Sequence, residues 1–214
     1  MVSDLLKFAC LYLCIKGIKF QMETIFIEDK TFDNSDFTRR PLTKGDYENC
    51  TFINCDFSNA DLGDIRFSET AFISCNLSMT QLTKTAFSDI RFKDCKMLGL
   101  HFENCHQSVL SVNFDNCNLT HCCFYQTQLK KTKFKSSKLQ EVDFTESDLT
   151  SAVFDNCDLT GAVFESTIIE KADFLTSFNY SINPEINRIK KAKFSLSGIA
   201  GLLHKYDIII ERAS

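Results

Sequence analysis

The chain has 214 residues and a formal net charge of −4, which allows one substantial core or at most two small domains. An apolar content of 44% with 24% charged residues excludes a disordered chain and a bundle of membrane helices. The unusual features are 21 Phe and 11 Cys with no Trp, and only 7 Gly and 2 Pro. Secreted disulfide scaffolds are also rich in Cys, but they are normally much shorter and lack a large core.

Residues 1–21 do not fit the pattern that organises the rest of the chain. They contain an apolar run from Phe8 to Ile15, which is too short to span a bilayer, and no small-residue cleavage site follows it. Met22 stands directly before the first recognisable repeat. We therefore expect residues 1–21 to be a poorly ordered or non-native extension.

Residues 22–183 carry a large apolar side chain at every fifth position. A small residue or Cys usually stands two positions earlier, and Asp or Asn often lies between the two. A period of five is neither helical nor that of a simple alternating strand. It predicts a coil that bends at every unit, with the large and the small side chain inside and the other three positions facing water.

Every fourth large position is Phe, so four units of five residues predict one turn of a square coil. This column consists of Phe32, Phe52, Phe72, Phe92, Phe114, Phe134, Phe154 and Phe174. A neighbouring small column contains Cys55, Cys75, Cys95, Cys117 and Cys157. We predict that both columns form the core and that eight of the Cys are buried, reduced thiols, which indicates a cytoplasmic protein.

The five-residue phase slips by two residues within 103–113. The Phe column continues across the slip only if the two extra residues bulge out of the coil. We place His106, Gln107 and Ser108 at the tip of this bulge. Together with Glu103, these residues are predicted to contact a protein partner.

The coil is predicted to end near residues 179–183, because Asn183-Pro184 should interrupt it. Residues 184–214 are then expected to cover this end. Ser195 is expected to cap a short helix, and Ile208–Ile210 to form a short strand. An open coil end exposes unpaired backbone groups, so this segment is either a cap on a monomer or a dimerisation segment. We favour a homodimer, whose interface comprises Leu196, Ile199, Leu203, Tyr206, Ile208 and Ile210.

Charge is unevenly distributed along the coil. Residues 76–140 contain four acidic and nine basic residues, whereas 141–183 contain nine acidic residues and one basic residue. Such stretches are usually solvated faces, but they can also steer a charged partner. In the second interpretation, Asp143, Asp148, Asp158 and Asp173 form an acidic face that contacts the partner as a mimic of the phosphates of DNA.

No catalytic or cofactor-binding motif is present, so we predict a protein that is not an enzyme and needs no cofactor. Cys123 falls at an outward position one coil after His101, with His106 and His121 nearby. This spacing matches no standard zinc pattern, and we predict no metal site. Neither membrane association nor direct binding of nucleic acid is expected.

The repeat resembles that of pentapeptide repeat proteins, which implies an all-β fold: a right-handed quadrilateral parallel β-helix with a short C-terminal helix. The segment 178–196, which begins Phe178-Asn179-Tyr180-Ser181-Ile182-Asn183-Pro184, resembles the C-terminal region of Qnr-type proteins, as does the break in phase. That branch protects DNA gyrase and topoisomerase IV from fluoroquinolones as a rod-shaped dimer. The resemblance implies the same partners here. The alternative is a structural or regulatory scaffold, or an immunity protein, with another partner.

Overall fold

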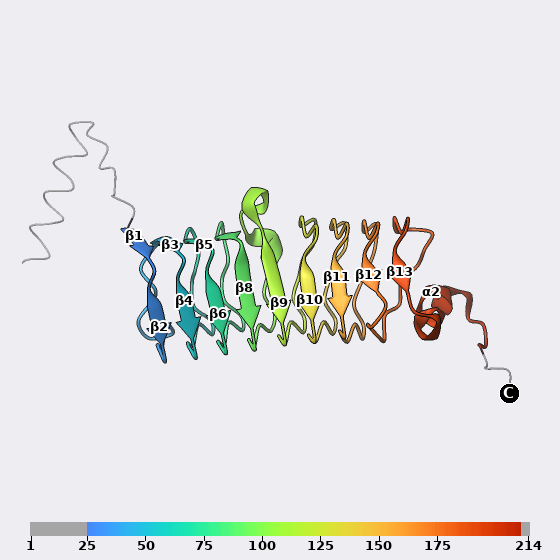
Figure 1. Ribbon diagram of the computed structural model, residues 1–214, viewed down its shortest axis with the longest axis horizontal. Coiled ribbons are helices and arrows are strands. Elements are labelled where there is room, and N and C mark those ends of the chain that lie inside the picture. The colour runs from blue at the N-terminus through green and yellow to red at the C-terminus, as the bar shows by residue number, and fades with distance from the viewer. Residues whose placement is uncertain (1–24, 211–214) are drawn as a thin grey trace, which may run out of the picture.

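Parallel strands stacked along one axis form the body of the protein (Figure 1). The computed structural model describes residues 25–210, and the predicted extension 1–21 lies outside them. As predicted, the fold is a right-handed quadrilateral parallel β-helix with a short C-terminal helix. The helices within residues 25–210 are all too short to cross a membrane.

Two faces of the square coil contain regular strands. One carries a four-stranded sheet of β1 (Ile25–Glu28), β3 (Gly45–Glu48), β5 (Arg66–Ser68) and β7 (Ala86–Ser88). The other carries a nine-stranded sheet of β2 (Thr31–Asp33), β4 (Thr51–Ile53), β6 (Ala71–Ile73), β8 (Ile90–Lys93), β9 (Val112–Asp115), β10 (Lys133–Lys135), β11 (Val153–Asp155), β12 (Asp173–Phe174) and β13 (Lys193–Phe194). Isolated parallel bridges connect successive turns elsewhere.

The strand register confirms the predicted turn of 20 residues. Phe52 pairs with Phe72, and Phe134 pairs with Phe154. The only step of 22 residues in the nine-stranded sheet joins Phe92 to Phe114, across the slip in phase. The two extra residues are therefore accommodated outside the sheet, and the Phe column continues without interruption.

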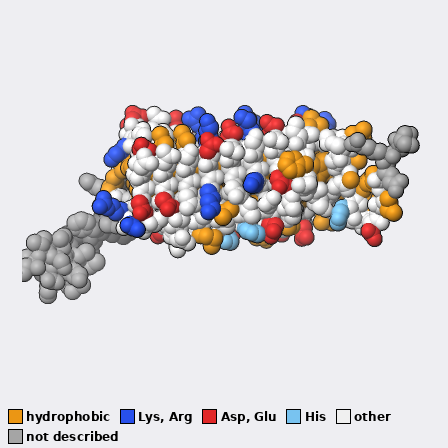
Figure 2. All heavy atoms as spheres, turned by 90° about the horizontal axis from the view of Figure 1, so that it is seen from below, with side chains coloured by type: hydrophobic (Ala, Val, Ile, Leu, Met, Phe, Trp, Pro, Cys, Tyr) orange, Lys and Arg blue, Asp and Glu red, His pale blue; other side chains and the backbone are white. Residues whose placement is uncertain are grey.

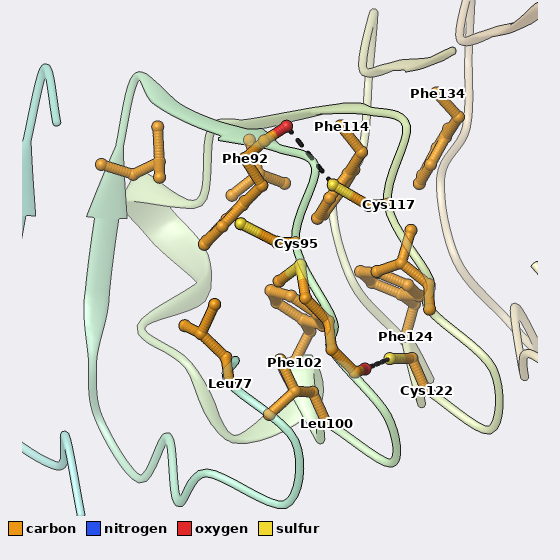
Figure 3. Close-up of a cluster of buried hydrophobic side chains, with 14 of the residues drawn as sticks. Leu77, Phe92, Cys95, Leu100, Phe102, Phe114, Cys117, Cys122, Phe124 and Phe134 are labelled. Atoms are coloured by element: carbon orange, nitrogen blue, oxygen red, sulfur yellow. Dashed lines mark hydrogen bonds between the residues drawn. The ribbon is translucent and has the colours of Figure 1, made fainter. Parts of the chain in front are cut away.

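The core consists of stacked rings beside a column of small side chains (Figure 3). The rings of Phe92 and Phe114 stack at 5.4 Å, and those of Phe114 and Phe134 at 5.2 Å. The predicted core residues are buried except Phe32, which is half-buried because it lies in the first turn. Each thiol of the small column donates to a backbone carbonyl of the preceding turn, as Cys117 does to Phe92 O at 3.4 Å.

The corners of the coil explain why so few Gly are needed. One residue in most units adopts a positive φ, for example Asn54 at 53° and Lys171 at 59°. Asn and Asp accept this left-handed conformation more easily than other residues with a side chain, and they occupy many of these corners. Only Gly99 and Gly161 supply glycine at such a position within residues 25–210.

The coil extends further than the sequence predicted. β13 pairs with β12, and Phe194 adds a ninth ring to the column, 5.3 Å from Phe174. The predicted end near residues 179–183 is therefore one turn too early. At the equivalent position of an earlier turn, Phe144 N donates a hydrogen bond to the following turn. No turn of the coil follows residue 184, so no backbone N–H is needed there. Proline, which has no N–H, is therefore tolerated at this position.

Three short helical segments cover the C-terminal end: η3 (Leu196–Gly198), α2 (Ala200–Leu203) and η4 (His204–Tyr206). Ser195 caps η3 as predicted, since its hydroxyl accepts from Gly198 N. Ile182 N donates to Gly201 O at 2.9 Å, which satisfies one backbone group of the last turn. The prediction of a strand at Ile208–Ile210 is wrong for this chain alone, because no neighbouring strand lies beside the segment within residues 25–210.

Candidate functional site

The bulge is the most prominent projection from the rod (Figure 1). It contains two single-turn helices between β8 and β9, η1 (Phe102–Asn104) and η2 (Gln107–Val109). Phe102 and Cys105 remain in the core, so the chain leaves the coil only after Cys105. Ser111 N then donates to Phe87 O at 2.8 Å and returns the chain to the regular path.

Two of the predicted contact residues of the bulge hold it in shape instead of pointing to solvent. The side-chain amide of Gln107 donates to Phe102 O, Glu103 O and Cys105 O at 2.9, 3.3 and 3.2 Å. Glu103 is half-buried and bonds His101 Nδ1 at 2.7 Å. Both residues therefore position the bulge, a role that the spacing of residues in the sequence does not reveal.

The outer surface of the bulge is formed by His106, Ser108 and Val109. His106 and Ser108 are exposed and hydrogen-bonded to each other at 3.0 Å. Val109 is 41% exposed, although the five-residue period assigns it to the interior. Together they expose one apolar and two polar side chains on the surface of the bulge.

A basic surface adjoins the bulge. Gln107 and Ser108 share a hollow of about 470 Å³ with Lys130 and Lys131 of the next turn. The neighbouring sheet face carries a shallow groove of about 540 Å³ over strands β4, β6 and β8 to β11. Its walls include Arg91, Lys93, Lys133 and Lys135, which we call the basic sheet face.

The floor of this groove is apolar, and few of its charges are neutralised. Ala71, Ile73 and Val153 line it beside the edges of the stacked rings. Within residues 25–210, only Lys135 of the basic sheet face forms an ion pair, with Asp115 at 3.4 Å. Four cationic side chains against the two carboxylates of Asp115 and Asp155 leave the groove net basic, which suits a protein surface that carries carboxylates.

The four aspartates predicted to form an acidic face lie on four different faces of the rod. Asp143 is bridged to Val163, Asp148 to Ile168 and Asp158 to Phe178, while Asp173 belongs to the nine-stranded sheet. Each belongs to a different column of the square coil. The prediction of one acidic face from these residues is therefore wrong, because successive units of five turn through successive corners.

These aspartates also have structural partners. Asp148 Oδ1 accepts from Thr150 N at 3.0 Å, and its other oxygen pairs with Lys130 at 3.1 Å. Burial acts to raise the pKa of Asp148, but the bonds from Thr150 and Lys130 outweigh it and leave that pKa below its ordinary value. Asp143, Asp158 and Asp173 accept from the N–H two residues ahead in the same way. Their charge mainly stabilises the turns of the coil.

Acidic and basic side chains are interspersed over the face seen in Figure 2. Hydrophobic side chains gather at the end of the rod that carries the C-terminal segment (Figure 2). Of the predicted dimer residues, Leu196 is 87% exposed, Ile199, Tyr206, Ile208 and Ile210 are also exposed, and Leu203 is half-buried. Exposed apolar side chains therefore lie close together at this end of the rod.

A mixed cluster of side chains lies at the base of the bulge. His101, Glu103 and Cys123 present ligand atoms that all lie within 4.8 Å of one another. Burial raises the pKa of the Cys123 thiol to about 11. The register of the coil predicts the pairing of His101 with Cys123, but not the approach of Glu103. The other two histidines considered with them lie apart, His121 against Glu141 and His106 against Ser108.

The chain is similar to known proteins in its repeat and in its fold. The model of the pentapeptide repeat region matches residues 46–111 and 107–177. No curated protein sequence matches the chain significantly. Full-length QnrB1, described as a plasmid-mediated fluoroquinolone resistance protein, is similar in structure with a TM-score of 0.56 and 16% identity, over 86% of this chain and 100% of that one.

HetL, described as a pentapeptide repeat protein involved in heterocyst differentiation regulation in the cyanobacterium Nostoc, gives a TM-score of 0.45 and 14% identity. That match covers 88% of this chain and 94% of HetL. The family model spans more than half of the chain, and the register, core and corners described above account for its repeat. The chain belongs to the pentapeptide repeat family.

Proposed function

We propose that this protein is a non-catalytic interaction protein that binds a bacterial type II topoisomerase, DNA gyrase or topoisomerase IV, and protects it from fluoroquinolones. The bulge is the observation that carries the proposal. It is the one interruption of the 20-residue register between Phe32 and Phe174, and it exposes His106, Ser108 and Val109 to a partner. The resemblance of the C-terminal segment to Qnr-type proteins and the fold shared with QnrB1 support the choice of partner.

The contact surface differs from the one that the sequence predicted. The four aspartates lie on separate faces, so they offer no continuous row of carboxylates that could imitate a DNA strand. The bulge, by contrast, is continuous with the hollow at Lys130 and Lys131 and lies beside the basic sheet face. We therefore assign docking to the bulge and this basic surface.

Deleting His106 and Gln107 is expected to abolish protection while leaving the coil folded. The deletion removes the two extra residues, so Ser108 and Val109 take the outward and inward positions of an ordinary unit and the 20-residue register is restored. Val109, now 41% exposed, would then enter the core. Supercoiling by gyrase in the presence of ciprofloxacin should be rescued by the wild type and not by the deletion variant.

Two controls separate loss of docking from loss of folding. The denaturation midpoint of the deletion variant should equal or exceed that of the wild type. Replacing both Arg91 and Lys133 with Gln should weaken rescue, whereas Lys96→Gln, an exposed residue on another face, should not. Full rescue by the deletion variant would refute docking through the bulge, and absence of rescue by the wild type at any concentration would refute topoisomerase protection itself.

We further propose that the protein is a homodimer joined through the exposed apolar side chains of its C-terminal end. Leu196 and Ile209 are 87% and 88% exposed, which a second copy of the same surface would cover. Replacing both with Asp should convert a dimer into a monomer in analytical ultracentrifugation, because carboxylates at the centre of an apolar interface are costly to desolvate. A wild-type protein that sediments as a monomer at all concentrations would contradict this proposal.

The alternative is a regulatory scaffold or immunity protein with another partner. The basic sheet face is equally compatible with it, because its cationic side chains complement an acidic surface on any protein partner. Capture of partners from the host with wild-type protein and with the His106–Gln107 deletion variant distinguishes the two. If the alternative is correct, the specific partner is a protein other than a topoisomerase subunit.

A further inference from the structure

We propose that His101, Glu103 and Cys123 form a binding site for a divalent transition metal, with Zn²⁺ as the preferred ion. An imidazole nitrogen, a carboxylate oxygen and a sulfur meet there, all within 4.8 Å of one another. The inference does not depend on the proposed topoisomerase partner, because it concerns the base of the bulge and not its outer surface.

The register of the coil brings two of the three ligands together. His101 and Cys123 form a parallel bridge between adjacent turns, so their side chains leave the same face at the separation of neighbouring strands, about 4.8 Å. Glu103 follows in η1, just before the chain leaves the regular coil, and its carboxylate turns back to His101 Nδ1 at 2.7 Å. The three groups therefore converge because a regular turn and the start of the bulge meet at this point.

One carboxylate oxygen of Glu103 has no partner. Oε1 bonds the His101 ring, but Oε2 is buried and accepts no hydrogen bond from any described residue. A buried anionic oxygen without a donor is unfavourable, and each such atom in a native protein calls for a reason. A bound cation supplies that reason, because it would neutralise the carboxylate and occupy its free lone pairs.

The ligand set matches the chemistry of zinc. Thiolate, imidazole and carboxylate are the three side chains that Zn²⁺ uses most, at about 2.0–2.3 Å from the ion. Donors around a tetrahedral ion then lie about 3.3–3.8 Å apart, so the present cluster needs only small side-chain rotations to close. Asp143 Oδ2 lies 3.9 Å from the Cys123 sulfur, and its negative charge favours a cation here. Water would complete the coordination.

Metal binding would link the base of the bulge to the next turn of the coil. His101 and Glu103 belong to the turn that carries the bulge, and Cys123 belongs to the following one. A ligand that binds only the folded state raises stability through mass action. The expected structural effect of Zn²⁺ is thus a higher unfolding temperature and slower amide exchange at the backbone of residues 101–111.

The test uses untagged full-length protein, reduced and freed of metal. Titration with Zn²⁺ in a calorimeter should show one equivalent bound, and Co²⁺ should give the thiolate-to-cobalt charge-transfer band together with the visible bands of a tetrahedral ion. Cys123→Ser should remove the charge-transfer band and weaken Zn²⁺ binding at least tenfold. Glu103→Gln should also weaken binding at least tenfold while circular dichroism remains unchanged.

Two matched controls identify the site. His121→Gln alters an exposed histidine outside the cluster and should leave Zn²⁺ affinity unchanged. The double variant Cys10→Ser/Cys14→Ser removes the two thiols outside the described residues and should also bind as the wild type does. The proposal is overturned if the wild type binds neither ion, or if Cys123→Ser and Glu103→Gln bind Zn²⁺ as tightly as the wild type.

Discussion

Replacing Phe134 with Ala is expected to destabilise the protein by about 3–5 kcal/mol, because it leaves a ring-sized cavity in the middle of the coil. Phe134 is 0% exposed, and its ring stacks on Phe114 at 5.2 Å and on Phe154 at 4.9 Å. The ring edges of Phe124 and Phe144 contact it from the next face. The free energy of unfolding measured with guanidinium chloride would show the loss.

Phe178→Ala is the matched control, since the same residue type is removed from a position that is 45% exposed. We expect a change within about 0.5 kcal/mol for that variant. Phe134→Leu keeps most of the volume and should cost less than about 1.5 kcal/mol. Because each turn contacts only its neighbours, the loss of amide protection in Phe134→Ala should be greatest between residues 110 and 160. Equal losses for Phe134→Ala and Phe178→Ala would show that the ring column does not determine stability.

Stability is expected to fall steeply above about pH 9. Burial raises the pKa of Cys122 and of Cys157 to about 12, and it also raises the pKa of Cys105. In the unfolded chain a thiol has a pKa of about 8.5, so the unfolded state loses these protons first. The contribution of each thiol is complete below that value and is lost as the pH rises towards the folded pKa.

Each such thiol reduces the free energy of unfolding by about 1.4 kcal/mol per pH unit in this window, so the three together give about 4 kcal/mol per unit. Denaturation midpoints measured between pH 7 and pH 11 would give the slope. In Cys122→Ala/Cys157→Ala the slope should decrease by about 2.7 kcal/mol per unit. Alanine fits the small inward position of the repeat, as the buried Ala152, Ala162 and Ala172 show. A slope that the double variant does not change would mean that the thiols are not the groups responsible.

Residues that repeat locally were predicted well. The positions of Phe52 and Cys55 in a unit decide that both point inward, and the same unit recurs along the chain, so burial could be assigned before the turns were paired. The position of the bulge could be predicted because the regular five-residue period slips there. The sequence predicts the end of the coil one turn too early, because it treats Pro184 as a break. Proline interrupts a coil of this kind only where a following turn would accept a hydrogen bond from the N–H that proline lacks.

The candidate site was predicted less well, because it depends on where side chains turn after the coil has formed. Gln107 was expected at the tip of the bulge, but its amide binds three carbonyls of the bulge itself. Asp148 was expected to face a partner, but it caps its own corner and pairs with Lys130. Nothing in the spacing of these residues distinguishes a free side chain from one that satisfies a backbone group.

The sequence by itself determined the coil, its 20-residue turn, its core of rings and thiols and the position of the bulge, because all of these follow from a five-residue period and from burial of apolar surface. Only the tertiary structure decided that the lysines beside the bulge border a groove, and that Glu103 meets His101 and Cys123. These arrangements depend on the rotation of the chain at each corner and on contacts between turns. The abundance of Phe and Cys is therefore a property of the repeat, whereas the candidate binding surfaces arise where the repeat is interrupted.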